Sequence, residues 1–329
     1  MFQTKLWIKE KYLKKSLASK QEKISKQVET ANLVGNLLGF FFKFFVFTFF
    51  GLLILFPFYL MISMSLLDTQ VVLTNNTSNL PIYPKSVDGD GISLHFENFK
   101  NAFQSGYFKS LVMTAGVTAI SIVGKIFFSI TFGYAFSLRK WKFKSASWLL
   151  FLSLLVLPEV ALLSGQYKVA VTLGWHVGPM QLVSLSMPFV ASVFSGFMYR
   201  NSFESIPDSV KESAMIDGAS EFKFFVKIAI PMVKSTTWTV GILTAFAAWN
   251  SFIWPSLILS GSNNNGYSVL NLWLFTTGKS SDSDISSRIF INIRMAAIIL
   301  VILPMFITYF FFRKRIMNAI SRQGRATKG

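Results

Sequence analysis

The 329-residue sequence contains no cysteine and only two histidines, His95 and His176. The lack of cysteine excludes disulfides, thiolate metal sites and cysteine nucleophiles. Because the two histidines lie far apart in the chain, we expect no metal site. Charged residues are scarce at 14%, compared with about 25% in an average soluble domain. So few charges do not cover a globular surface with water-facing groups, which argues against a soluble enzyme.

Sequence motifs of catalysis are also lacking. The nucleotide-binding pattern G-x-x-x-x-G-K-[ST] does not occur, because Gly124-Lys125 is followed by Ile126 and position 119 is alanine. Neither G-x-S-x-G nor H-E-x-x-H is found. We therefore expect a chain that is not an enzyme, with no catalytic residue, metal or cofactor of its own.

Apolar residues, in contrast, make up 52% of the sequence and gather in long runs. Each run reaches the roughly 18 residues that a membrane-crossing helix needs. They predict an all-α integral membrane protein with six transmembrane helices. The third run is interrupted by Pro158-Glu159. The runs are Leu37–Leu66, Phe108–Leu138, Ser147–Ser164, Val177–Tyr199, Thr236–Leu259 and Ile289–Phe312.

Basic residues lie mostly on one side of these runs. Segments 1–35, 139–146, 200–235 and 313–329 hold 23 of the 32 lysines and arginines, whereas the alternate segments hold five. Positive charge marks the cytoplasmic side of a membrane protein. We therefore expect a multi-pass protein of the cell membrane with both termini in the cytoplasm. Topology and lipid headgroups explain the net charge of +17 without a nucleic-acid partner.

The regions outside the spans divide the chain further. Residues 1–35 mix lysine and glutamate with spaced apolar residues, which is typical of a cytoplasmic or interfacial helix, although a solvated leader that only sets the topology fits equally. We expect residues 36–312 to form the six-span membrane domain, with 67–107 as an external loop. Residues 313–329 form a basic cytoplasmic tail.

The segment 200–235 differs from a plain basic loop because its five acidic residues balance its five basic ones. Pro207-Asp208-Ser209 predicts the start of a short helix, with Ser209 and Glu212 as a capping box. Gly218 predicts a tight turn. A second amphipathic helix follows and ends or bends at Pro231. Its expected apolar face consists of Phe222, Phe225, Val226 and Ile230. Such a helix pair either binds a partner or packs against headgroups and the bundle.

The spacing within this segment resembles a known motif. Glu212-Ser213-Ala214, then Gly218 after three residues and Ile228-Ala229-Ile230-Pro231 after nine more, is similar to the EAA loop of ABC importer permeases. That pattern reads E-A-A, three residues, G, nine residues, I-x-L-P. Ser213 and Ile230 are mild departures from it. The wider segment is most similar to the carbohydrate-uptake, maltose-type branch of the family.

Further segments extend the resemblance over most of the chain after residue 35. They look like the smaller, six-span permease of that branch, and in one of them Ser251 replaces the usual aspartate. The segments are His95–Phe99, Tyr107-Phe108, Tyr134–Arg139, Trp249–Pro255 and Gly324–Gly329.

The resemblance implies a type I ABC importer permease-like fold and a set of partners. These are a second, larger permease, two cytoplasmic ATPase subunits that hold ATP and magnesium, and an extracytoplasmic substrate-binding protein. The loop residues would couple the permease to an ATPase, with Glu212 as the electrostatic anchor. The implied coupling residues are Glu212, Ser213, Ala214, Asp217, Gly218, Ile228 and Pro231.

Polar residues within the spans are candidates for the translocation path because they are costly to expose to lipid. Trp249 and Trp254 offer flat faces to a sugar ring, although tryptophan belts at the membrane interface are the commoner explanation. Arg294, like Lys43 near the inner end of the first span, has a second reading as a residue whose charge reaches the interface. The path candidates are Lys125, Glu159, Trp249, Asn250 and Arg294.

The implied substrate is a sugar or short oligosaccharide, with glycerol 3-phosphate or a related phosphodiester as the alternative. A secondary transporter or a channel subunit is the rival class. A secondary transporter is expected to contain inverted repeats around mid-membrane charges, and no repeat between the two halves is evident.

Overall fold

The computed structural model describes residues 9–20, 33–74, 81–86, 91–137, 141–260, 268–279 and 289–326. Within these ranges the chain forms helices and no strand, apart from two isolated bridges, Lys85–Ile92 and Lys279–Ile289. The chain divides into two units, Met1–Leu60 and Met61–Gly329. The predicted all-helical class is therefore confirmed for the described part of the chain.

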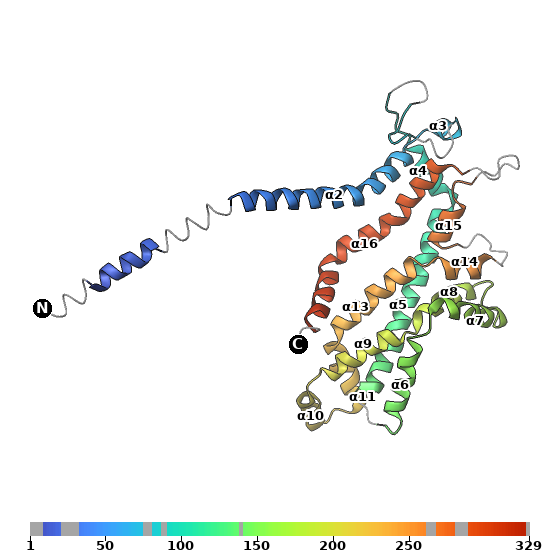
Figure 1. Ribbon diagram of the computed structural model, residues 1–329. Helices are drawn as coiled ribbons and strands as arrows, with labels where there is room; N and C mark the ends of the chain where they lie inside the picture. The colour runs from blue at the N-terminus through green and yellow to red at the C-terminus, as the bar shows by residue number, and fades with distance from the viewer. Residues whose placement is uncertain are drawn as a thin grey trace. The chain divides into compact units, whose positions relative to one another are not determined.

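Unit 1 contains a helix over residues 9–20 and most of α2, Leu33–Ser65 (Figure 1). Apolar side chains surround α2 on all sides, including Phe41, Phe42, Phe44 and Phe47, each more than half exposed. A helix that is apolar around its whole circumference suits lipid or a buried position, not water. This helix matches the first predicted span.

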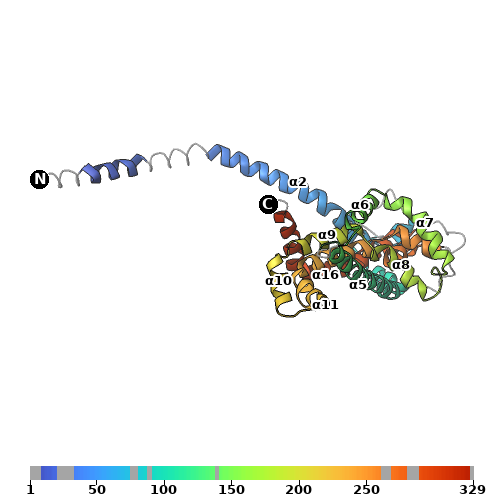
Figure 2. The same ribbon diagram turned by 90° about the horizontal axis from the view of Figure 1, so that it is seen from below.

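Unit 2 is built around α5, Phe108–Ser137, which follows α4 and η2 across a kink at Ser105 and Gly106, where the backbone is not helical. Helices α8, α9 and α13 pack against α5, and α16 packs on α4, α13 and α15. Figure 2 shows α10 and α11 together at one end of this unit, away from α7. The other bounds are α3 Thr69–Thr74, α4 Glu97–Ala102, η2 Phe103–Tyr107, α6 Lys144–Leu154, α7 Glu159–Thr172, α8 Met180–Val190, α9 Val193–Glu204, α13 Lys234–Trp249, α14 Ile253–Ser260, α15 Leu270–Thr276 and α16 Ile291–Ala326.

Three described helices are long and apolar enough to cross a membrane: Gly35–Ser65, Glu97–Ser137 and Ile291–Lys314. They correspond to the first, second and sixth predicted spans. The fourth and fifth correspond to two bent pairs, α8 with α9 at 54° and α13 with α14 at 52°. The third is divided at Pro158 into α6 and α7, neither of which passes as a span. Up to five spans are thus present by length and composition, and six stays a prediction.

Two prolines inside the helices of unit 2 free a backbone carbonyl, and an aromatic side chain from elsewhere donates to each one. Proline lacks an N–H, so the carbonyl four residues earlier loses its helical donor. In α8, Pro188 frees the carbonyl of Ser184, which accepts a hydrogen bond from the Trp254 indole at 3.0 Å. Membrane helices tolerate proline when a neighbour satisfies the freed group in this way.

The second pair connects α16 with η2. Pro304 frees the carbonyl of Leu300, and the Tyr107 hydroxyl donates to it at 2.9 Å. We expect Tyr107→Phe to lower the free energy of unfolding by about 1 kcal/mol, because the carbonyl loses its donor in an apolar setting. The measurement is the melting midpoint of the purified chain in detergent.

The matched control for this change is Pro304→Ala, which returns a backbone N–H to the helix. In that background Tyr107→Phe should cost much less. Equal losses in the two backgrounds would show that the hydroxyl does not act through the freed carbonyl.

A cluster of buried amides joins the segment after α2 to α4 and α16. The Asn98 amide donates to the carbonyls of Ser65 and Leu67 at 2.9 and 2.8 Å. The Asn292 amide donates to Thr69 Oγ1 and Asn98 Oδ1, each at 3.0 Å. Asn292 is fully buried and Asn98 is 2% exposed. These bonds tie the turn at the end of α2 to the start of α16.

Candidate functional site

The 200–235 segment forms two short helical stretches between α9 and α13. The first, α10, spans Asp208–Ile216 and follows Pro207, whose extended backbone has φ −59° and ψ 139°. No side chain caps this helix, so the predicted capping box of Ser209 and Glu212 is wrong. The helix starts two residues earlier than that box requires, and Asp208 places its charge in the first turn, where the helix dipole favours it. Glu212 lies in the middle of α10 instead.

The helix α10 ends in a tight turn at Gly218. Gly218 has φ +71°, the left-handed region, as predicted for a tight turn. Its N–H donates to the carbonyl of Met215 at 3.0 Å, and the N–H of Ala219 donates to the carbonyl of Ala214 at 2.9 Å. This pair of bonds is the Schellman motif, in which the glycine takes the left-handed position directly after the helix.

The second stretch changes its helical period partway. It begins with α11, Glu221–Phe224, capped by Ser220, whose hydroxyl accepts from the N–H of Lys223 at 3.3 Å. The π-helical η3, Phe225–Ala229, follows, then α12, Ile230–Met232. A proline ring clashes with the carbonyl four residues earlier in an α-helix. The wide turn of η3 directly before Pro231 relieves that clash, and the chain bends two residues later, at Val233.

This change of period alters which side chains are buried. Phe225 and Ile230 pack inward as predicted, but Phe222 and Val226 are 75% and 42% exposed. Phe224 and Ala229 are buried in their place. The predicted apolar face was therefore half wrong. The π-turn of η3 inserts an extra residue and shifts the side chains from Val226 onward relative to an α-helix, whereas Phe222 and Phe224 precede this turn in α11.

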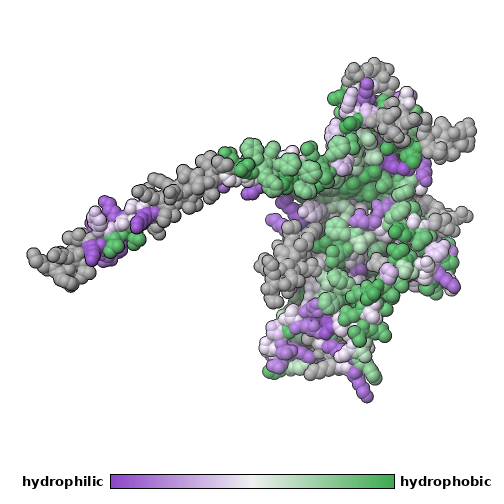
Figure 3. Space-filling model, in the orientation of Figure 1, coloured by the Kyte–Doolittle hydropathy of each residue, from purple (hydrophilic) through white to green (hydrophobic). Residues whose placement is uncertain are grey.

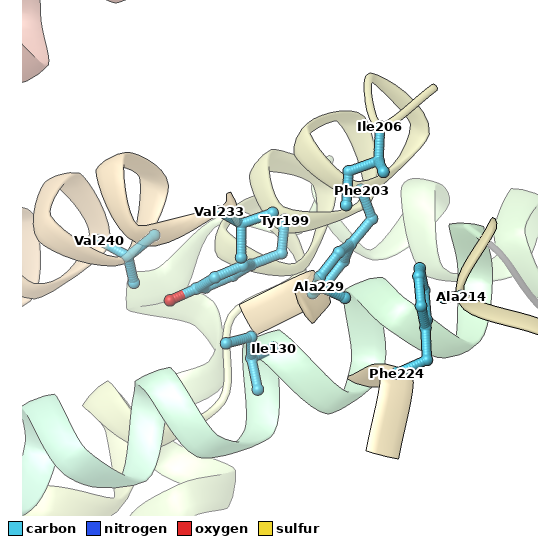
Figure 4. Close-up of a cluster of buried hydrophobic side chains, with 9 residues drawn as sticks. All are labelled: Ile130, Tyr199, Phe203, Ile206, Ala214, Phe224, Ala229, Val233 and Val240. Atoms are coloured by element: carbon cyan, nitrogen blue, oxygen red, sulfur yellow. The ribbon is translucent and has the colours of Figure 1, made fainter. Parts of the chain in front are cut away.

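The buried side chains of this segment continue into the bundle core (Figure 4). Figure 4 shows Ala214 of α10 next to Phe224 of α11. The Phe225 ring lies 4.4 Å from that of Tyr134 on α5, centroid to centroid, and 6.4 Å from that of Phe203 on α9. A displacement of α10 therefore reaches two helices of the bundle through packed rings. The core cluster consists of Ile130, Tyr199, Phe203, Ile206, Ala214, Phe224, Ala229, Val233 and Val240, with Ile228 packed against it.

The outer face of α10 combines acidic and apolar side chains. Glu212, Ser213, Asp217 and Gly218 are exposed. Beyond them Met215 is 54% and Ile216 is 86% exposed, although both are apolar. Figure 3 shows purple, hydrophilic residues gathered at this end of unit 2 and a broad green surface over the rest of it. Exposed apolar side chains within a polar region mark an interaction surface.

The predicted path residues do not form one site. Trp249 and Asn250 lie at the break between α13 and α14. Trp249 packs partly buried against the cluster around Trp273, and its indole nitrogen has no hydrogen-bond partner among the described residues. Asn250 is exposed, and its amide donates to the carbonyl of Phe246 at 2.9 Å. Asn271 was missed from the sequence: its amide donates to the carbonyls of Trp249 and Ser251 at 3.0 and 3.2 Å and so holds the break.

The other candidates lie apart from this break. Arg294 donates to the carbonyls of Thr277 and Phe275 at 3.2 and 3.1 Å, which places its guanidinium at the carbonyl end of α15. Lys125 is half-buried on α5. Glu159 is the first residue of α7, and its side chain lies outside the described part of the structure. Trp254, the second tryptophan predicted as a possible sugar contact, is only 5% exposed, and its indole N–H donates to the carbonyl of Ser184.

Comparison with known proteins adds to this description. No family model matches the chain. It is 49% identical over 299 residues to a probable ABC transporter permease protein of Mycoplasma pneumoniae, covering 89% of this chain and 90% of the relative. It is 26% identical over 275 residues to the arabinooligosaccharides transport system permease protein AraQ of Bacillus subtilis, covering 83% and 91%. It is 31% identical over 219 residues to the sn-glycerol-3-phosphate transport system permease protein UgpE of Pectobacterium atrosepticum, covering 64% and 73%.

A solved structure has the same fold. It is that of a bacterial ABC transporter involved in the import of the acidic polysaccharide alginate, with a TM-score of 0.67 at 19% identity, covering 85% of this chain and 97% of that one. The apolar helices and the relatives together define an integral membrane protein of transport. The chain belongs to the ABC transporter permeases.

Proposed function

We propose that this chain is a permease subunit of an ATP-driven importer and that the outer face of α10 is its contact with a cytoplasmic ATPase. The observation that carries the proposal is the exposure of Met215 and Ile216 beside Glu212, on a helix whose opposite side is anchored in the core by Ala214. A rigid helix with an apolar outer face suits a groove in a partner better than it suits water.

The same proposal assigns roles to the motif residues. Glu212 and Asp217 supply negative charge to the ATPase, and small Ser213 permits close approach. Gly218 forms the turn, while Ile228 and Pro231 set the second stretch against the core. ATP and magnesium bind in the ATPase, not in this chain. Closure of two ATPase subunits moves α10, and the ring contacts of Phe225 pass the movement to α5 and α9.

The remaining parts of the importer are a second, larger permease and an extracytoplasmic binding protein. Both termini of this chain face the cytoplasm, in agreement with the charge bias of the segments between the spans. The path candidates Trp249 and Asn250 lie at a broken helix, where the exposed Asn250 side chain suits a polyhydroxylated substrate. Lys125, Glu159 and Arg294 remain candidates on the remaining helices.

The proposed substrate is a sugar or short oligosaccharide, as the names of AraQ and of the alginate importer suggest. The second candidate, glycerol 3-phosphate or a related phosphodiester, is favoured by the similarity to UgpE. Mass spectrometry of the ligand retained by the cognate binding protein distinguishes them. A phosphorus-free saccharide supports the first candidate, and a phosphorylated polyol supports the second.

A cross-linking experiment tests the contact between α10 and the ATPase. Because this chain has no native cysteine, an introduced cysteine is its single reactive thiol. In the importer expressed with its partners, Met215→Cys or Ile216→Cys, treated with a short amine-and-thiol cross-linker, should give a product that contains the ATPase. The matched control is Ile92→Cys, 72% exposed in the predicted external segment. ATPase cross-linking at Ile92 but not at Met215 would overturn both the contact and the orientation.

A further inference from the structure

The helix of residues 9–20 in unit 1 combines a narrow apolar stripe with several lysines. It carries five lysines and one glutamate, and the Lys14 ammonium lies 3.1 Å from the Glu10 carboxylate. At 100° per residue, Leu13 and Leu17 are 40° apart and form one stripe. Both are more than half exposed, at 56% and 59%. No described residue covers this stripe.

The residues beside the stripe suit the boundary between lipid and water. Tyr12 and Lys14 lie about 100° to either side of Leu13 by helical geometry. Tyrosine and lysine combine an apolar stem with a polar end, which lets them sit at the level of lipid headgroups. Lys11 and Lys15 lie on the side opposite Leu13, whereas Lys9 and Lys20, at the two ends of the helix, lie within about 40° of Leu13. The long stems of these two lysines let their ammonium groups reach the headgroups while the leucines lie among the acyl chains. A short apolar stripe bordered by lysines suits a helix lying in a membrane surface.

The sequence context favours a membrane surface over a protein groove. The apolar helix α2 begins at Leu33, so the helix of residues 9–20 is held within a short chain length of a membrane span. The net charge of +4 over these twelve residues complements anionic headgroups, which makes a lipid surface the better match.

We propose that residues 9–20 bind the anionic surface of the membrane, with Leu13 and Leu17 inserted among the acyl chains and the lysines paired with lipid phosphates. This contact fixes the position of the N-terminal segment at the membrane before α2 enters it. The proposal depends only on the membrane location of the chain and is independent of the ATPase contact.

Spin labels on single cysteines test the proposal in the full chain, which has no native cysteine. Leu13→Cys and Leu17→Cys are compared with Lys11→Cys and Lys15→Cys in nanodiscs of phosphatidylcholine with and without phosphatidylglycerol. With the anionic lipid, labels at 13 and 17 should be accessible to oxygen, which concentrates in lipid, and labels at 11 and 15 to a water-soluble nickel chelate. Without it, or in high salt, labels at 13 and 17 should become accessible to the chelate.

A label at Leu53→Cys, in the middle of α2, is the control because it reports lipid in every composition if the span is inserted. Chelate access at 13 and 17 in all lipids would identify a solvated leader and overturn the proposal. Protection of these two sites from both reagents would identify a protein contact and overturn it equally. Replacing the five lysines with glutamine should abolish the effect of phosphatidylglycerol, and a persistent effect would contradict the role of charge.

Discussion

Gly218→Val should reduce substrate uptake at least tenfold while the chain still inserts in the membrane. No atom lies within 4 Å of the position that a Cβ would take at Gly218, so the substitution meets no steric clash. Its effect comes from φ +71°, which costs an L-residue about 1–2 kcal/mol and a β-branched residue more. Leaving this conformation breaks the hydrogen bonds to the carbonyls of Met215 and Ala214, so the outer face of α10 loses its fixed position. The measurement is uptake of labelled substrate, together with ATPase activity of the purified complex.

The matched control is Gly218→Asn, because asparagine tolerates the left-handed region. It should retain most of the uptake, although its side chain is larger than hydrogen.

A companion change, Glu212→Ala, leaves the turn intact and removes only an exposed charge, so it should weaken co-purification of the ATPase. Unchanged uptake and unchanged ATPase co-purification in both Gly218→Val and Glu212→Ala would refute the coupling role of this segment.

Gly133→Ala should be the most damaging single-methyl change in the bundle. A Cβ at this position of α5 would lie 2.5 Å from the Tyr199 Cβ and 2.8 Å from the backbone nitrogen of Arg200. These atoms belong to the adjacent helix α9, and a backbone does not move aside as a side-chain end does. Overpacking of this kind costs about 1–3 kcal/mol or separates the helices. We expect a lower melting midpoint in detergent and a reduced monodisperse fraction in size-exclusion chromatography.

Two other helical glycines give a graded comparison. A Cβ at Gly196 would meet the ring of Phe132 at 2.4 Å, and that ring is able to rotate, so Gly196→Ala should cost less. Gly165 in α7 has nothing within 4 Å, and Gly165→Ala should stabilise the helix by about 0.5–1 kcal/mol. Equal melting of the Gly133 and Gly165 variants would show that α5 and α9 do not approach closely.

Hydropathy predicted the positions of the membrane spans but not their shapes. It located most of Gly35–Ser65, Glu97–Ser137 and Ile291–Lys314, because long apolar runs with few charges are a local property of the sequence. It placed residues 97–107 in the external loop, whereas they form α4 and η2 at the start of the second long helix. It did not indicate that the fourth and fifth runs bend by 54° and 52°. Those bends depend on bonds such as those from Asn271 to the carbonyls of Trp249 and Ser251, which join residues 20 or more positions apart.

In the 200–235 segment, too, the sequence predicted the features that depend on neighbouring residues but not those that depend on packing against other helices. Gly218 predicted a tight turn that its left-handed backbone and the Schellman bonds then confirmed, because such a turn is determined by neighbouring residues. The buried face of the second stretch was not predictable from an α-helical period. The ring of Phe225 packs against those of Tyr134 and Phe203, which lie on other helices.

The sequence by itself determined the membrane class, the family and the position of the motif segment, since each depends on composition or on the spacing of nearby residues. Only the tertiary structure decided which side chains donate to the carbonyls that Pro188 and Pro304 leave without a helical partner. It also decided that α5 and α9 touch at Gly133 and which side of α10 remains exposed. The physical reason is that each of these features depends on contacts between residues that are far apart in the sequence. The local pattern of neighbouring residues does not show which distant residues pack together.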